Sequence, residues 1–116
     1  MTPEQRTIAR NAKALRIWRD CSKVLLGHRC WPQLDAATIA KVENPPSPLW
    51  NASDETLQRL AHGLGVSARV LRGEAPLPKG LRRALSGAAA RDPDPGVRAC
   101  HRVLCNLLPK ETAVHA

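Results

Sequence analysis

The stretch LDAATIAKVEN, residues 34–44, combines the signals of a short helix with unusually small side chains. Asp35 is a typical N-cap residue, and the prolines at 45 and 46 stop the helix. A thin apolar stripe is formed by Leu34, Thr38 or Ile39, and Val42. The opposite side is nearly flat and consists of Ala36, Ala37, Ala40 and Lys41. Because a core helix would carry larger residues, the pattern predicts a helix with a smooth outer face.

The composition of the chain favours a small, basic, helical protein. Its 116 residues are enough for one domain and an appendage. It contains three tryptophans and no Phe or Tyr, so its core must be built from Leu, Ile, Val and Ala. Its 18 Lys and Arg against 10 Asp and Glu give a net charge of +8, which favours an anionic partner such as nucleic acid. The alternative is a basic surface that only keeps the protein in solution.

Two features of the sequence bear on its location. No apolar run approaches the roughly 20 residues that span a bilayer. The N-terminal segment MTPEQRTIARNAK has no apolar stretch of the kind found in secretory signals. Both observations predict a cytoplasmic protein that does not interact with a membrane.

The four cysteines lie within expected helices or at their edges, where cysteine acts as a small apolar residue. Zinc sites usually contain close cysteine pairs with about two to four residues between them. Cys21 and Cys30 are too far apart for this pattern, and Cys100 and Cys105 would point to different faces of one helix. We therefore expect reduced cysteines with a structural role, no metal and no cofactor.

Catalytic motifs are not evident in the sequence. It contains no Gly-rich phosphate loop, no H-E-x-x-H pattern and no Ser/His/Asp set in a suitable context. Cys100 and His101 are adjacent, and neighbours on a helix point about 100° apart, which disfavours a nucleophile–base pair. The sequence therefore predicts a binding protein rather than an enzyme.

Helical patterns separated by proline and glycine cover most of the chain. The first helix is expected near residues 3–19, with Thr2 as its cap. Its apolar face consists of Ile8, Ala12, Leu15 and Trp18. A second helix follows the capping residues 20–22 and ends at Trp31-Pro32, with Gly27 weakening its middle. Its expected apolar anchors are Val24, Leu25 and Leu26.

The prolines of NPPSPLWN, residues 44–51, predict a loop before two further helices. Ser53 caps the first of these, and Ser67 caps a shorter one that carries Val70 and Leu71 and stops at Gly73. The buried face of the first is expected to contain Leu57, Leu60, Ala61 and Leu64. The chain is thus predicted to be all-α.

Pro76 and Pro78 mark an expected boundary between two domains, residues 1–75 and residues 76–116. The second is expected to be a helical hairpin of Leu81–Ala90 and Val97–Leu108, joined by the turn at residues 92–96. The apolar residues at helical spacing are Leu81, Leu85, Ala88, Val97, Cys100, Leu104, Leu107 and Leu108. This hairpin either packs within the chain or makes a dimer contact.

Two stretches resemble lambda-repressor-like (XRE-type) helix-turn-helix regulators. In the recognition helix of that family, a polar cap is followed by three variable residues, an apolar anchor and a glutamate four positions later. Asp35, Ile39 and Glu43 fit this pattern. The segment DETLQRLAHGLGVSARVLRGE, residues 54–74, resembles the fourth and fifth helices of the family. The resemblance covers roughly residues 10–74 and implies a five-helix DNA-binding domain.

The resemblance also implies how the domain would bind double-stranded DNA. The residues assigned to the major groove are Ala36, Ala37, Thr38, Lys41 and Asn44. Alanine and the threonine methyl group are suited to thymine methyl groups, whereas Asp35 is expected to cap the helix. Ala40 is expected to pack against a neighbouring helix. The candidate phosphate contacts are Lys23, Arg29, Lys41, Arg10, Arg16 and Arg19.

The sequence departs from the family pattern in two places. The turn before the proposed recognition helix contains Trp31-Pro32, and the loop that follows Glu43 is longer than usual. This loop contains Trp50, which either packs at the edge of the core or sits on the sugar-phosphate backbone of DNA. The core is favoured, because a lone tryptophan is usually packed.

Together, these features predict a sequence-specific transcriptional regulator, in particular a repressor that binds a palindromic operator as a homodimer. One alternative is the antitoxin of a toxin–antitoxin pair, which uses the same domain to regulate its own operon and adds a toxin protein as a partner. Another is a nucleic-acid binder without sequence preference.

Overall fold

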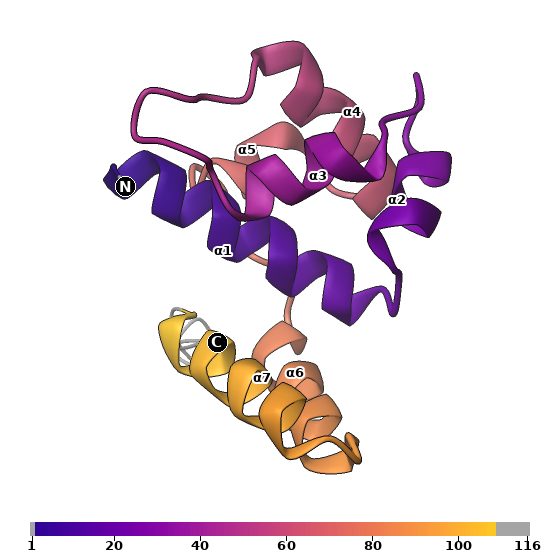
Figure 1. The fold of residues 1–116 in the computed structure, drawn as a ribbon, viewed down its shortest axis with the longest axis vertical. Coiled ribbons are helices and arrows are strands. Elements are labelled where there is room, and N and C mark those ends of the chain that lie inside the picture. The colour runs from indigo at the N-terminus through magenta and orange to yellow at the C-terminus, as the bar shows by residue number, and fades with distance from the viewer. Residues whose placement is uncertain (1, 109–116) are drawn as a thin grey trace. The chain divides into compact units, whose positions relative to one another are not determined.

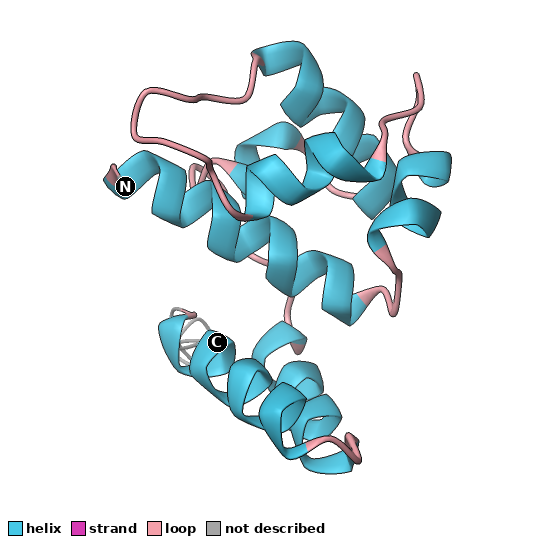
Figure 2. Cartoon of the chain, in the orientation of Figure 1, coloured by secondary structure: helices cyan, strands magenta, loops and turns pink. Residues whose placement is uncertain are grey.

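The structure, a computed structural model, describes residues 2–108, apart from the side chains of residues 88 and 89. All regular elements of the described part are helices, so the predicted all-α class is confirmed (Figures 1 and 2). They are α1 (Pro3–Trp18), α2 (Lys23–Arg29), α3 (Ala36–Glu43), α4 (Asp54–Leu64), α5 (Ala68–Leu71), α6 (Leu81–Arg91) and α7 (Pro95–Leu107). Within residues 2–108, none of these helices has the length and apolar character needed to cross a membrane.

The chain forms two compact units, residues 1–77 and residues 78–116. In the first unit, α1 packs against α3 and α5, α2 packs against α3 and α4, and α4 packs against α5. The fully buried side chains at the centre of this unit are Leu15, Leu26, Ile39, Leu57, Leu60, Leu64 and Leu71. The buried face predicted for α4 is confirmed, because Leu57, Leu60, Ala61 and Leu64 are all buried.

Capping residues fix the beginnings of the helices where the sequence predicts them. Thr2 and Gln5 form a reciprocal capping box at the start of α1. Ser22 caps α2, and Ser53 caps α4 through a side-chain hydrogen bond. Ser67 occupies the corresponding position of α5, but its side chain makes no capping hydrogen bond.

The prediction that Val24 and Leu25 anchor α2 in the core is wrong. These side chains are 59% and 41% exposed, whereas Leu26 is fully buried. Successive helical residues point about 100° apart, so three in a row cannot face the same neighbours. Because α2 is only seven residues long and packs along one side, Leu26 and Gly27 face the core instead.

In the second unit, α6 and α7 pack against each other. The buried residues of this hairpin are Leu81, Leu85, Leu104, Cys105 and Leu108. Val97, Cys100 and Leu107, which were predicted to share the buried stripe of α7, are exposed instead. The helix begins at Pro95, two residues before its predicted start. Cys100 and Leu107 lie on a side of α7 that α6 does not cover, whereas Val97 shares the side of Leu104 and Leu108 but is 36% exposed in the first turn. The side chain of Ala88 lies outside the described residues.

Candidate nucleic-acid interface

The beginning of α3 is fixed by Asp35, as predicted. One carboxylate oxygen of Asp35 accepts a hydrogen bond from the backbone amide of Thr38 at 2.8 Å. Hydrogen bonds from the side chain and the backbone of Thr38 lower the pKa of Asp35. The carboxylate of Asp35 is therefore engaged as the cap of α3.

The end of α3 is fixed by an ion pair with α1. The guanidinium of Arg16 donates from Nε to Glu43 Oε2 at 2.7 Å and from Nη2 to Glu43 Oε1 at 3.0 Å. A third donor of Arg16 reaches the carbonyl of Cys21 at 3.1 Å. The side chains of Arg16 and Glu43 are only 16% and 5% exposed. Arg16 therefore joins α1 to α3 within the first unit, and its role as a phosphate contact stays a prediction.

The outer face of α3 is small and exposed. Ala37, Lys41 and Asn44 are exposed, and their spacing of four and three residues places them along one side of the helix. Ala36, Thr38 and Ala40 are partly buried at its margins. Behind this face, Ile39 and Val42 are almost completely buried. The structure thus brings the five residues assigned to the groove onto the outer face of α3, at its margin or at its end.

A close backbone contact holds α2 against the turn that precedes α3. The amide of Leu34 donates to the carbonyl of Gly27 at 3.2 Å. A Cβ atom at position 27 would lie 2.2 Å from the carbonyl oxygen of Leu34, so only glycine fits there. The sequence pattern predicts only that Gly27 weakens the helix and gives no sign of this contact, because Leu34 lies beyond the end of α2.

Gly63 plays a similar part between α4 and the end of α2. A Cβ atom at this position would lie 2.7 Å from the sulfur of Cys30. Cys30 is buried, and burial raises the pKa of its thiol, with a smaller opposing effect from the backbone of Gly63. The cysteine therefore stays protonated and packs the turn, which agrees with a structural role.

The remaining candidate phosphate contacts divide into two kinds. Lys23 is partly exposed at the start of α2, and Arg29 is exposed at its end, where it also donates to Cys21 Sγ at 2.9 Å. In contrast, Arg19 Nε donates to the carbonyl of Leu64 at 2.9 Å, and its guanidinium lies 4.4 Å from the ring centre of Trp18. The guanidinium of Arg19 is therefore engaged by contacts within the first unit.

Arg10 is partly buried on α1, and its role as a phosphate contact stays a prediction. Burial lowers its pKa. Its Nε donates to Asn11 Oδ1 at 3.1 Å, and the amide nitrogen of Asn11 reaches the carbonyls of Val70 and Leu71 at 3.1 and 3.3 Å. These contacts connect α1 to α5. The sequence does not reveal the role of Asn11, because helical spacing of apolar residues marks a buried face and a polar residue does not contribute to it.

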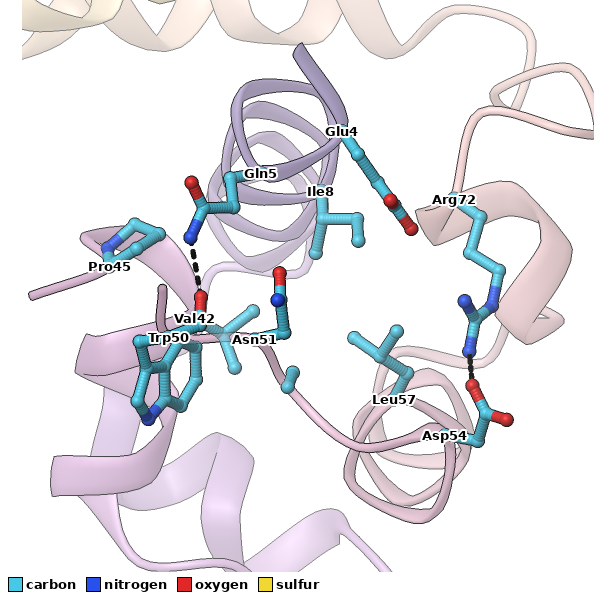
Figure 3. A pocket seen from close by; sticks show the side chains of 11 residues that line it. Glu4, Gln5, Ile8, Val42, Pro45, Trp50, Asn51, Asp54, Leu57 and Arg72 are labelled. Atoms are coloured by element: carbon cyan, nitrogen blue, oxygen red, sulfur yellow. Dashed lines mark hydrogen bonds and ion pairs between the residues drawn. The ribbon is translucent and has the colours of Figure 1, made fainter. Parts of the chain in front are cut away.

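The long loop after α3 is tied to α1 by Gln5. The side-chain amide of this buried glutamine donates to the carbonyl of Ser47 at 3.0 Å. It also donates to the carbonyl of Trp50 (Figure 3). The indole of Trp50 is partly buried. Residues of the loop, α1 and α4 line a pocket of about 210 Å³ that is open to solvent. Arg72 and Asp54, which form an ion pair, also line this pocket. Gln5 thus positions the loop at the end of α3.

No metal centre is formed within the described part of the chain. Among residues 2–108, no three or more His, Cys, Asp or Glu side chains are grouped so that they could hold an ion. Cys100 is exposed and Cys105 is buried, as expected for two residues on different faces of one helix.

Comparison of the chain with protein-family models, curated proteins and solved structures gave no match. The function is therefore inferred from the residues and the geometry of the chain itself. The most informative region is α3, which is anchored at both ends and presents a small, partly basic face to solvent.

Proposed function

We propose that the first unit is a five-helix, lambda-repressor-like DNA-binding domain and that the protein is a sequence-specific transcriptional regulator. In this proposal it represses transcription as a homodimer on a palindromic operator, with α3 as the recognition helix. The observation that carries the proposal is the way α3 is held. Asp35 caps its beginning, and Arg16 binds Glu43 at its end, so its outer face is rigidly presented.

The size of the α3 side chains supports insertion into DNA. The major groove is about 12 Å wide and admits a helix whose outer residues do not obstruct its floor. Ala37 provides such a surface, and the methyl group of Thr38 can contact thymine. Lys41 and Asn44, exposed on the same side, can reach a phosphate or a base edge.

The surroundings of α3 supply positive charge for phosphate binding. Lys23 and Arg29 lie on α2, which packs against α3. The segment between α2 and α3, residues 30–35, is longer than the usual turn of about three to four residues. The close contact of Gly27 with Leu34 nevertheless keeps the turn against α2. This arrangement supports docking of α2 and α3 together on one duplex.

The proposal is tested by binding of the full-length protein to labelled DNA from upstream of its own gene. An unrelated fragment of equal length is titrated in parallel at near-physiological salt. We expect a preference of about a hundredfold or more for the upstream fragment. Ala37→Glu should abolish this preference, because it places a bulky negative side chain on the groove-facing side of α3.

Gln58→Glu is the matched control, because it adds the same charge at an exposed position of a different helix, α4. It should retain binding. Equal and salt-sensitive binding to both fragments would contradict the proposal and favour a nucleic-acid binder without sequence preference. Failure to bind either fragment would also contradict it and direct attention to a protein partner.

A further inference from the structure

The helix α7 is apolar on two sides. One side, with Leu104, Cys105 and Leu108, is buried in the hairpin. The other side is exposed and lies on the opposite part of the helix circumference. We call this second side the α7 stripe, and it consists of Gly96, Ala99, Cys100, Val103 and Leu107. Their spacing of three and four residues gathers them within an arc of about 100°.

The α7 stripe contains large apolar side chains that are exposed. Val103 and Leu107 are each 60% exposed, although both are large apolar residues. The polar side chains of this helix, Arg102 and Asn106 among them, lie to one side of the stripe. A helix that is apolar over most of its circumference is typically covered on both sides.

We propose that the α7 stripe pairs antiparallel with the same stripe of a second copy of this chain. The size of its residues runs from small at the beginning of the helix to large at its end. In an antiparallel pair, Leu107 of one copy lies over Gly96 of the other, and Val103 lies over Cys100. A parallel pair would instead place large residues on large ones and leave a gap beside Gly96. Close packing therefore favours the antiparallel arrangement.

The expected strength of this contact follows from its size. The stripe is about 16 Å long. Pairing through it therefore buries a smaller area per partner than a standard interface, which buries about 800 Å². We expect a dimer that dissociates in the micromolar range and is favoured when two copies occupy adjacent half-sites. The pairing would supply the homodimer of the proposed function, and its role in DNA binding rests on that function. The pairing itself can be measured without DNA.

The inference is tested by sedimentation of the full-length protein over a range of about 1 to 200 μM. The wild type should form a dimer, and Val103→Glu should raise the dissociation constant by about a hundredfold or more. Because Val103 is largely exposed, the variant should keep its helical circular dichroism spectrum. Ser86→Glu is the matched control, since it adds the same charge at an exposed position of α6, and it should dimerise like the wild type.

Cross-linking with a short bismaleimide then tests the direction of the pair. Cys100 is the exposed one among the four cysteines, and its two copies should be linked in the wild type but not in Cys100→Ser. In the Cys100→Ser background, a chain with Leu107→Cys should link to a chain with Gly96→Cys. It should not link to a second copy of itself, because these positions lie about 16 Å apart along the antiparallel pair.

A wild-type protein that stays monomeric at all concentrations would overturn the inference. A dimer that is unaffected by Val103→Glu would also overturn it, because the interface would then lie elsewhere. Dimerisation through the α7 stripe without preference for any DNA would leave the inference standing and contradict the proposed function alone.

Discussion

The two units of the chain are stabilised in different ways. The first contains buried polar contacts that each join separate helices, namely Gln5 with the loop, Asn11 with α5, and Arg16 with Glu43. Among the described residues of the second, α6 and α7 are joined mainly by leucines and Cys105. The first unit also requires glycine where its backbones meet, whereas Gly87 in α6 faces only the flexible end of Arg91.

This difference indicates in which unit the helices are held in a defined position. Directional hydrogen bonds and backbone contacts fix a helix in one place, whereas apolar packing tolerates shifts and substitutions of similar volume. Two of these contacts, made by Arg16 and Gln5, fix α3 and the loop that follows it, and the contact of Asn11 fixes α5. Both units expose large apolar side chains, and in the second they are Val97, Val103 and Leu107 of α7. The polar contacts agree with a rigid recognition surface in the first unit, and the exposed side of α7 agrees with an association surface in the second.

The largest expected effect tests the ion pair that anchors α3. Glu43→Ala should reduce the stability of the first unit by about 3 kcal/mol, because it leaves the buried guanidinium of Arg16 without its carboxylate. Urea unfolding followed by tryptophan fluorescence measures this unit alone, since Trp18, Trp31 and Trp50 all lie within it.

The matched control for this ion pair is Glu55→Ala, which removes the exposed partner of Arg59 in α4. Its cost should stay below about 1 kcal/mol, because exposed ion pairs contribute little. Equal effects of the two substitutions would show that Glu43 does not hold α3.

A pair of glycine substitutions should sharpen the comparison of the units. Gly27→Ala should destabilise the first unit by about 2 kcal/mol, because the new methyl group collides with the carbonyl of Leu34. Gly87→Ala should stabilise the second unit by about 0.5 to 1 kcal/mol, because alanine is the better helix former and Arg91 can move away.

Tryptophan fluorescence follows the first of these glycine variants, and far-ultraviolet circular dichroism follows the second. Opposite signs are the expected result. A neutral Gly27→Ala would mean that the turn can move away from α2 without cost.

The smallest effect concerns the cap of α3 and depends on pH. Hydrogen bonds from Thr38 hold the pKa of Asp35 below its ordinary value in the folded protein. A lowered folded pKa contributes stability above the ordinary Asp pKa of about 3.9, and this contribution is lost as the pH falls through the folded value. Asp35→Asn keeps a capping oxygen but removes the charge.

Thermal unfolding of the wild type and Asp35→Asn should therefore differ slightly near neutral pH and converge in acid. The melting temperature from tryptophan fluorescence is the quantity to compare. A difference that persists unchanged at low pH would exclude the carboxylate charge as its source.

Local signals in the sequence were sufficient for the caps of α1, α2, α3 and α4, but not for the cap of α7. Thr2, Ser22, Asp35 and Ser53 each cap the helix predicted from their position, because capping involves residues only two or three apart. The apolar face of α4 could be predicted for the same reason, since helical periodicity places Leu57, Leu60 and Leu64 on one side. The flat outer side of α3 also follows from the sequence alone.

The tertiary structure decided which of these residues are available at the surface. Arg16 was one of several arginines outside the apolar stripe of α1, and only the packing of α1 on α3 brings it to Glu43. Likewise, the need for glycine at position 27 arises from a backbone seven residues away. On α7, packing against α6 buries Cys105 and leaves Val103 exposed. Periodicity shows that a helix has an apolar side, but the elements that pack against it determine which part of that side is covered.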